Sequence, residues 1–484
     1  MHSNAVNRLM PLWIAVLPLF TLLCVFIGGA LFTELGGNLV VVAILLSAVV
    51  AGLIGYARGI KWQSMEKAAV DKFADVFPVV LILLSIGGLI GSWMLSGTIP
   101  LFVWLGIALI DLQFIYVSAF IAASVMSLFT GSSWASAGTI GVALMGLATV
   151  MDASLPITAG AVISGAYFGD KMSPLSDSTN ISAIAAKADL YEHIRHMIYT
   201  ALPSFMIALV VFAVIPANQA SDSINAQHAT QAMQIMIEHV FLPAWWQMLP
   251  PLLIMVAIVK KWPPVVGITL STLLALLLAV GLQPFSVADA VNAYLHGFTL
   301  DMLPASQQHD ATTNTAFVKL VVRGGLYSMV GTLVVIIAAF LLAGAMQATG
   351  ALNVIIQSML KAVKGTFSLV ASTLVSGVTL LSLTSHGGVS SLIIGNLYQP
   401  AYTKHNLANV NLSRSIEDSV TLLDPLLPWT VSGLFMATTL GVATIDYLPW
   451  ALFCLGGPLF SLLWAALATR SGFGIRRLKL QTES

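Results

Sequence analysis

The sequence predicts an all-α protein that crosses a membrane many times, because of its composition and its long apolar runs. Of the 484 residues, 58% are hydrophobic and only 8% are charged, whereas an ordinary soluble domain carries about 25% charged residues. Apolar runs of nearly 20 residues, the length needed to span a bilayer as a helix, recur from one end of the chain to the other. We therefore expect one transmembrane domain over residues 1–484 in place of several soluble domains.

Eleven apolar runs are long enough to be complete spans. They lie near residues 11–32, 38–57, 76–95, 113–130, 197–215, 243–259, 263–281, 327–347, 366–383, 426–445 and 448–469. Four shorter pieces cannot cross a hydrocarbon layer of roughly 30 Å as straight helices, so half-helices or re-entrant hairpins are expected at 99–110, 138–150, 155–168 and 388–399. The first run is too long for the apolar part of a signal peptide, and we interpret it as a span.

Basic residues predict the orientation, because Lys and Arg favour short cytoplasmic loops. Arg8 precedes the first run, the next basic group follows the second run at 58–72, and another closes the chain at 470–479. The longer polar stretches 216–242 and 282–318 contain no Lys or Arg and are expected outside. Both termini should then lie in the cytoplasm, with an even number of crossings of the cell inner membrane.

The strongest sign of function is the segment from Gly169 to Asn180, GDKMSPLSDSTN. It places charged and hydroxyl side chains at membrane depth, where burying one charge costs about 2.5–3.5 kcal/mol, so such residues usually line an ion or substrate path. Pro174 removes a backbone donor and disfavours helix at the preceding residue, which frees carbonyl groups that can coordinate a cation. The candidate binding residues here are Asp170, Ser173, Asp177, Thr179 and Asn180.

A second acidic segment runs from Ser413 to Pro425 and again combines acids, hydroxyl groups and a proline beside an apolar run. Its candidate residues are Glu417, Asp418, Thr421 and Asp424, with Arg414 as a subsidiary candidate. Among all these acids, the candidate Na⁺ ligands are Asp170, Asp177 and Asp418.

Each acidic segment follows a break rich in Gly, Ser and Thr, TGSS at 130–133 and TSHGG at 384–388. The offsets are similar, since 418 − 170 = 248 and 384 − 130 = 254. This order predicts an internal duplication, with a first repeat region at 1–215 and a second at 243–469. Interrupted apolar segments at corresponding positions of two halves point to the binding site of a transporter. The breaks add Thr130, Ser132, Thr384 and Ser385 as candidates, and His386 as a subsidiary one.

At these residues the chain resembles the NhaC-type sodium/proton antiporter family. GDKMSPLSDSTN is similar to one family signature, and 411–418 with Thr421 and Leu427-Pro428-Trp429 is similar to a second. The resemblance implies Na⁺/H⁺ antiport by an ion-transporter fold with two inverted repeats and hairpins that reach the site from opposite sides. The group includes malate/lactate exchangers and, by relatedness, amino-acid carriers. His386-Gly387-Gly388 departs from the bulkier or polar pair expected there, which leaves the substrate open.

Structural roles are open for several of these residues. The acids of the first segment can cap helices or pair with Lys171. The acids of the second segment include two that follow Arg414 by three and four positions, the spacing of ion pairs on one helix face. His386 is as compatible with a packed neutral imidazole as with a proton or substrate ligand.

Other classes of function fit the sequence less well. Gly131-Ser132-Ser133 with His386 would be an intramembrane serine hydrolase, and the 167–170 segment with Asp418 an aspartyl protease pair, but neither has its family's full pattern. A channel would need an open polar pore. Twenty Lys and Arg balance twenty Asp and Glu, which leaves no basic excess for nucleic acid. Two cysteines, Cys24 and Cys454, cannot form a disulfide framework.

The sequence thus predicts a secondary Na⁺/H⁺ antiporter, not an enzyme, whose ligands are the transported ions and which needs no cofactor or nucleotide. In this hypothesis Asp170 or Asp177, nearby hydroxyl groups and Asn180 bind Na⁺, completed from the other repeat by Thr421 and Asp418, and protonation of a site carboxylate competes with Na⁺. The alternative is a Na⁺- or H⁺-coupled carrier of a small carboxylate or amino acid, which backbone N–H groups at the breaks would bind. A homodimer is expected from the family alone.

Overall fold

The structure is a computed structural model that describes residues 10–32, 38–216, 223–468 and 472–478. Within these ranges the chain forms α-helices, short 3-10 helices and two π-helical turns, with one isolated β-bridge between Leu407 and Arg477. The all-α prediction is confirmed. Arg8, Arg470, Lys479 and part of the polar stretch 216–242, which entered the predicted orientation, lie outside the described residues.

Eight helices are long and apolar enough to cross a membrane, and the number rises to eleven if three bent helix pairs each count as one span. The bent pairs join 230–241 to 245–259, 409–426 to 431–440, and 444–450 to 452–467, at bends of 94°, 45° and 58°. The chain is therefore a multi-pass membrane protein, and several of its spans are broken.

The helices fall into four consecutive groups. An N-terminal hairpin consists of α1 (Leu12–Phe32) and α2 (Asn38–Ala57). A first unit consists of α3 (Trp62–Leu95), α4 (Thr98–Leu109), η1 (Leu112–Phe114), α5 (Ile115–Thr130), α6 (Ser133–Ser136), η2 (Ala137–Gly141), α7 (Val142–Val150), α8 (Leu155–Met172), α9 (Asp177–Ala185) and α10 (Leu190–Val214).

A connecting group and a second unit complete the chain. The connecting group consists of α11 (Ser223–Phe241), η3 (Trp245–Met248), α12 (Leu249–Val259), α13 (Pro264–Leu282), α14 (Val287–His296), η4 (Leu300–Met302) and α15 (Ala305–Thr313). The second unit consists of α16 (Thr315–Val321), η5 (Leu326–Met329), α17 (Val330–Ala348), α18 (Ala351–Lys361), α19 (Thr366–Thr384), α20 (Gly387–Lys404), α21 (Asn409–Ile416), η6 (Glu417–Thr421), η7 (Asp424–Leu426), α22 (Val431–Leu440), α23 (Thr444–Tyr447), η8 (Leu448–Trp450) and α24 (Leu452–Leu467).

A single shift of about 254 residues maps the first unit onto the second. The first residues of α6 and α20, α8 and α21, α9 and α22, and α10 and α23 all differ by this number, since 387 − 133, 409 − 155, 431 − 177 and 444 − 190 each equal 254. For α3 and α16 the shift is 315 − 62 = 253. The repeated elements therefore occupy residues 62–214 and 315–467.

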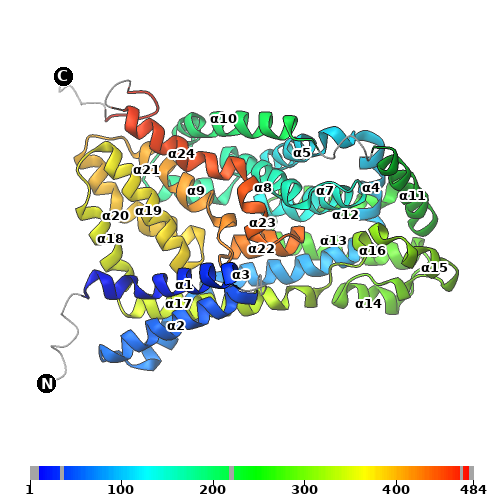
Figure 1. Cartoon of the computed structure of the whole chain (residues 1–484), viewed down its shortest axis with the longest axis horizontal. Helices are drawn as coiled ribbons and strands as arrows, with labels where there is room; N and C mark the ends of the chain where they lie inside the picture. Colours follow the sequence, from blue (N-terminus) through cyan, green and yellow to red (C-terminus); the bar gives the residue numbers. More distant parts are fainter. Residues whose placement is uncertain (1–9, 33–37, 217–222, 469–471, 479–484) are drawn as a thin grey trace.

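Helices at equivalent positions of the two units pack side by side and antiparallel. The first turns of α3 meet the end of α17, where Gly344 lies against Ala69, and the end of α3 meets the start of α17, where Gly87 lies against Gly325. In the same way, the α10 residues 199 and 204 meet the α24 residues 464 and 456. In Figure 1, α17 lies with α1 and α2 along one edge of the molecule and α10 along the other, with α8, α9, α22 and α23 between them.

Several helices are longer than their apolar runs predict. The piece expected at 138–150 belongs to an 18-residue candidate span, 133–150, so it is longer than expected. The pieces at 155–168 and 388–399 lie in α8 and α20, which have 18 residues each but are not apolar enough to count as candidate spans, and the piece at 99–110 is the 12-residue α4. The run expected at 76–95 is the candidate span Phe77–Leu95, which is the second part of a longer helix, α3, that begins at Trp62. Polar residues at helix ends thus continue a helix where the protein supplies partners for them.

Close packing of α8 on α5 brings the first acidic segment to the first break. A Cβ atom at Gly169 would lie 2.4 Å from the backbone nitrogen of Leu128, and one at Gly165 would lie 2.3 Å from the carbonyl oxygen of Phe120. Small residues at such positions let two helix backbones approach closely. The approach places Asp170, one residue after Gly169, directly beside the chain that follows α5.

Candidate functional site

The two breaks and parts of both acidic segments surround one cavity of about 1050 Å³. Of the predicted candidates, eight line it: Thr130, Ser132, Asp170, Asp177, Asn180, His386, Thr421 and Asp424. Apolar residues of α3, α12 and α13 close its other side, among them Ile86, Ile254 and Ile268. The cavity therefore joins polar groups from both units under an apolar cover supplied largely by the connecting group.

The first break is a left-handed turn followed by a capped helix. Gly131 has φ of +66°, and the hydroxyl of Ser132 accepts a hydrogen bond of 3.2 Å from the backbone N–H of Ala135. The Thr130 hydroxyl bridges across the turn to Ser136 Oγ at 3.3 Å. A side chain that caps the new helix explains why the chain can stop one helix and begin another inside the protein.

The second break repeats this geometry at positions 254 residues later. Ser385 has φ of +55°, and His386 Nδ1 accepts a hydrogen bond of 3.3 Å from the backbone N–H of Val389. Thr384 Oγ1 bridges to Ser390 Oγ at 2.7 Å. The first residues of α6 and α20, Ser133 and Gly387, both line the cavity, so the N-terminal ends of these helices, which favour negative charge, lie beside it.

Asp170 lies in the last turn of α8, and hydroxyl groups hold both of its carboxylate oxygens. Ser176 Oγ donates to Oδ1 at 2.5 Å, and Ser133 Oγ donates to Oδ2 at 2.6 Å. Ser133 is the first residue of α6, so this bond ties the acid to the first break. Only 8% of Asp170 is exposed, and it reaches the cavity.

Asp424 occupies the equivalent position of the second unit, since 424 − 170 = 254. Its Oδ2 accepts a hydrogen bond of 2.7 Å from Ser432 Oγ, and its backbone carbonyl accepts one of 2.5 Å from Thr430 Oγ1. Thr430 also caps α22, as Ser176 caps α9 at the equivalent position. The cavity thus contains two carboxylates, one from each unit, each beside the break of its own unit.

Known antiporters are similar to this chain over most of its length. The sequence profile of the Na⁺/H⁺ antiporter family matches residues 165–468. A protein of Haemophilus influenzae described as an uncharacterized Na⁺/H⁺ antiporter is 40% identical over 458 residues, 95% of either chain. The Na⁺/H⁺ antiporter NhaC of Alkalihalophilus pseudofirmus is 34% identical over 432 residues, 89% of this chain and 91% of the relative. The chain belongs to the Na⁺/H⁺ antiporter family. The resemblance to NhaC-type antiporters is confirmed.

One relative is named for the exchange of organic acids. The malate-2H⁺/Na⁺-lactate antiporter of Bacillus subtilis is 30% identical over 444 residues, 92% of either chain. All these relatives are named as antiporters. The chain is therefore similar to transporters, and none of these relatives is named as a hydrolase or protease.

Asp418 was predicted to complete the cation site opposite Asp170. In the structure it lies outside the cavity lining, beside Lys171. It is fully buried, forms an ion pair with the ammonium group of Lys171, and accepts hydrogen bonds from Thr200 at 3.1 Å and Ser461 at 2.6 Å. The offset of the helices, 254, makes Asp424 and not Asp418 the equivalent of Asp170 in this structure, and the part of Asp418 in binding the cation stays a prediction.

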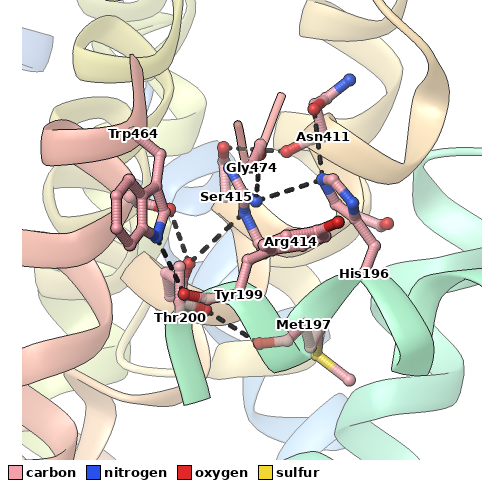
Figure 2. Close-up of polar contacts among 12 residues, drawn as sticks. His196, Met197, Tyr199, Thr200, Asn411, Arg414, Ser415, Trp464 and Gly474 are labelled. Carbon is pink, nitrogen blue, oxygen red and sulfur yellow. Dashed lines mark hydrogen bonds and ion pairs between the residues drawn. The ribbon is translucent and has the colours of Figure 1, made fainter. Parts of the chain in front are cut away.

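Arg414 lies in a separate polar cluster next to this ion pair. Figure 2 shows its guanidinium between His196 and Gly474, with Nη1 at 3.1 Å from His196 Nε2 and 2.5 Å from the Gly474 carbonyl oxygen. Its Nε lies 4.0 Å from Asp418 Oδ2, and His196 Nε2 in turn lies 3.2 Å from Asn411 Oδ1. Arg414 therefore pairs with Asp418, as the structural alternative predicted, and joins the C-terminal segment to α21.

The remaining predicted candidates do not line the cavity. They are Ser173, Thr179, Thr384, Ser385, Glu417, Asp418 and Arg414. Thr179 Oγ1 donates to the carbonyl oxygens of Asp170 and Lys171 at 3.2 and 3.1 Å, and so fixes the end of α8. The Ser385 carbonyl accepts from the Val431 N–H at 3.2 Å and joins the second break to α22. These contacts do not test whether the seven residues bind the transported ions, so that role stays a prediction.

Sequence reasoning missed three serines that hold the carboxylates. Ser133 and Ser176 donate to Asp170, and Ser432 donates to Asp424. Ser133 and Ser176 lie inside the segments that were singled out, but hydroxyl groups there are too numerous to rank without geometry. Ser432 lies beyond the second acidic segment, and the shift of 254 residues would have found it, because it corresponds to Ser178 of the first motif.

Proposed function

We propose that the protein exchanges Na⁺ for H⁺ across the cell inner membrane, and that the cavity between the two breaks is where both ions bind. The single observation that carries the proposal is the pair of carboxylates, Asp170 and Asp424, which the two units present to one cavity at equivalent positions. Buried acids are costly inside a membrane protein and usually mark an ion path.

The chemistry of the cavity supports a hard cation. Its polar lining includes carboxylate and hydroxyl oxygens and the amide of Asn180, together with His386 and Lys261, and oxygen ligands are those that hard metal ions prefer. Na⁺ would bind a carboxylate in its ionised form, and a proton on the same group would displace it. One site then serves both ions, and exchange requires only that the empty, unprotonated carrier does not change its orientation.

We further propose that the two units act as inverted repeats. The antiparallel packing of α3 on α17 and of α10 on α24 supports this relation, and alternating access in such transporters arises when one repeat moves against the other around a fixed site. In the proposed orientation both termini are cytoplasmic, which the distribution of Lys and Arg supports.

An exchanger of small organic acids is the second candidate function. The observation that favours it is the size of the cavity, about 1050 Å³, which exceeds what a single Na⁺ ion needs. The N-terminal ends of α6 and α20 lie beside this space and could bind a carboxylate. The similarity to the malate-2H⁺/Na⁺-lactate antiporter supports the same class of substrate.

Transport by the purified protein tests both candidates. In proteoliposomes with a trapped pH indicator, an inward Na⁺ gradient should alkalinise the lumen without ATP, and Asp170→Asn should abolish this exchange because it removes a charge while nearly preserving volume. The variant should still be purified as a monodisperse protein, since an amide costs less to bury than a carboxylate.

The same vesicles separate the alternatives. If exchange occurs only when malate or lactate is present, the organic-acid candidate replaces Na⁺/H⁺ antiport. If Asp170→Asn exchanges Na⁺ for H⁺ at the wild-type rate with unchanged pH dependence, Asp170 is structural. Uncoupled conductance in the wild type would favour a channel.

A further inference from the structure

The two equivalent carboxylates differ in how many donors surround them. Ser133 stands at the first position of α6 and donates to Asp170. The equivalent first position of α20 is Gly387, since 387 − 133 = 254, and a glycine has no side chain to donate to Asp424. The two units therefore differ in the hydroxyl groups that hold their acids, which are Ser133 and Ser176 in the first unit and Ser432 in the second.

Asp170 has a hydrogen-bond donor on each carboxylate oxygen. Ser176 Oγ lies 2.5 Å from Oδ1 and Ser133 Oγ lies 2.6 Å from Oδ2. Both donors are themselves fixed by helix starts, because Ser176 caps α9 and Ser133 begins α6. A carboxylate in this position is satisfied by the protein alone.

Asp424 keeps one oxygen without any donor. Its Oδ2 accepts from Ser432, but Oδ1 has no hydrogen-bond partner among the described residues. The residue is 8% exposed and lines the cavity. A buried polar atom without a partner costs roughly 1–3 kcal/mol, and more if it is charged, so this oxygen calls for a ligand from the cavity.

Gly387 leaves room for that ligand. A Cβ atom at Gly387 would lie 3.1 Å from Asp424 Oδ2, the oxygen that accepts from Ser432, so the space left by the glycine lies beside the carboxylate group that carries the vacant Oδ1. Thr421 lines the same part of the cavity, and the peptide nitrogen four residues later belongs to Pro425, which cannot donate to the Thr421 carbonyl. A vacant carboxylate oxygen of Asp424 and the Thr421 side chain thus line one cavity.

We propose that Asp424, Thr421 and the space left by Gly387 form the Na⁺ subsite of the cavity, and that Asp170, whose oxygens the protein already satisfies, is not the first ligand of the ion. The proposal rests on the proposed function, because it names the carboxylate that binds the exchanged cation. Gly387 is then a specificity-determining residue: its missing side chain makes one of two equivalent acids a cation ligand.

Na⁺ binding to the purified protein tests this assignment without transport. Isothermal titration with NaCl in detergent, with choline chloride as the blank, should show Na⁺ binding for the wild type. Asp424→Asn should weaken it at least about tenfold, and clearly more than Asp170→Asn does. Gly387→Ser, which places a hydroxyl where Ser133 stands in the other unit, should also weaken it, and Gly387→Ala should do the same by filling the space.

The matched control is Gly331→Ser. Gly331 also lies in the first turn of a long helix, α17, and a Cβ atom there meets nothing within 4 Å. This variant should bind Na⁺ with wild-type affinity, and size-exclusion profiles should show that all variants are folded. If Gly387→Ser misfolds, Gly387→Ala and Asp424→Asn still decide the matter.

The outcomes separate the subsite from the proposed function. If Asp424→Asn and the Gly387 variants bind Na⁺ like the wild type while Asp170→Asn does not, the assignment is overturned and Asp170 is the ligand. Loss of binding in Asp424→Asn together with absence of Na⁺/H⁺ exchange in wild-type vesicles would support the subsite and refute antiport. Wild-type protein that exchanges Na⁺ for H⁺ but binds no Na⁺ at millimolar concentrations would overturn the subsite alone.

Discussion

At the scale of single residues, two acids six positions apart in the second unit have opposite environments. Asp418 is surrounded by donors, with Lys171, Thr200 and Ser461 in hydrogen-bond contact and Arg414 at 4.0 Å. Asp424 accepts one side-chain hydrogen bond and faces the cavity. The protein itself thus supplies partners to both oxygens of Asp418, whereas one oxygen of Asp424 has no hydrogen-bond partner among the described residues.

The ion pair of Lys171 and Asp418 should therefore be needed for folding. Asp418→Asn leaves the buried ammonium group without its partner, and breaking such a pair typically costs about 3–5 kcal/mol. We expect a large drop in the thermal transition of the detergent-solubilised protein, measured by differential scanning fluorimetry. The double variant Lys171→Met with Asp418→Asn should regain part of the loss, because it removes the unpaired charge.

An exposed ion pair supplies the control for this comparison. Arg476 and Glu192 lie 3.3 Å apart at the surface, and exposed pairs contribute about 0–1 kcal/mol, so Glu192→Gln should hardly change the transition temperature. A double variant no more stable than Asp418→Asn alone would show that the unpaired charge is not what destabilises the single variant.

Several residues that line the cavity could be predicted from the sequence, but which acid of the second segment faces the cavity could not, for a physical reason. Asp170, Thr421 and Asp424 were singled out from their acidic or hydroxyl groups near membrane depth, and they line the cavity. Which of Asp418 and Asp424 faces it depends on the path of the chain through a π-helical turn, 417–421, and a 3-10 turn, 424–426. These turns rotate the side chains in a way that helical periodicity does not predict.

At the scale of elements, the two breaks show the same turn built from different residues. Gly131 takes the left-handed conformation in the first break, and Ser385 takes it in the second. A left-handed conformation costs a residue with a side chain about 1–2 kcal/mol, so the second break carries a strain that the first avoids. The hydroxyl bridges from Thr130 to Ser136 and from Thr384 to Ser390 fix both turns.

Substitutions in the two breaks should therefore act in opposite ways on stability. Gly131→Ala adds the cost of the left-handed conformation and a Cβ atom 2.7 Å from that of Leu175, so we expect a lower thermal transition and less folded protein. Ser385→Gly removes the strain. The free energy of unfolding should stay the same or rise by up to about 1 kcal/mol, and the thermal transition should not fall. Equal effects of the two changes would contradict the turn geometry as the cause.

The sequence also indicated the order of the elements more reliably than their lengths. The breaks at 130–133 and 384–388 were recognised from Gly, Ser and Thr, and the shift between them, 254, is the shift of the helices that follow. Helix ends were misjudged where polar residues continue a helix, as Asp170 and Lys171 do at the end of α8. Apolar length alone cannot reveal this, because the partners Ser133 and Asp418 come from other elements.

At the scale of the whole molecule, antiparallel packing of equivalent helices links the fold to the orientation of the chain. The start of α3 lies at the end of α17, so the equivalent helices cross the protein in opposite directions. If the first unit begins on the cytoplasmic side, as the basic residues at 58–72 predict, the second unit should begin outside. The stretch 282–318, which leads into the second unit and contains no Lys or Arg, fits this arrangement.

Labelling of single cysteines tests the orientation and the inverted relation together. In a variant with Cys24 and Cys454 replaced by Ala, a membrane-impermeant maleimide added to intact cells should label Asn225→Cys and His309→Cys, because both lie in stretches without basic residues. Lys67→Cys, near the start of α3, should be labelled only after the cells are opened, since Lys and Arg favour the cytoplasmic side. Protection of Asn225→Cys in intact cells would reverse the proposed orientation. Labelling of Lys67→Cys and His309→Cys from the same side would instead retain the antiparallel packing of α3 and α17 but refute inverted repeats that begin on opposite faces of the membrane.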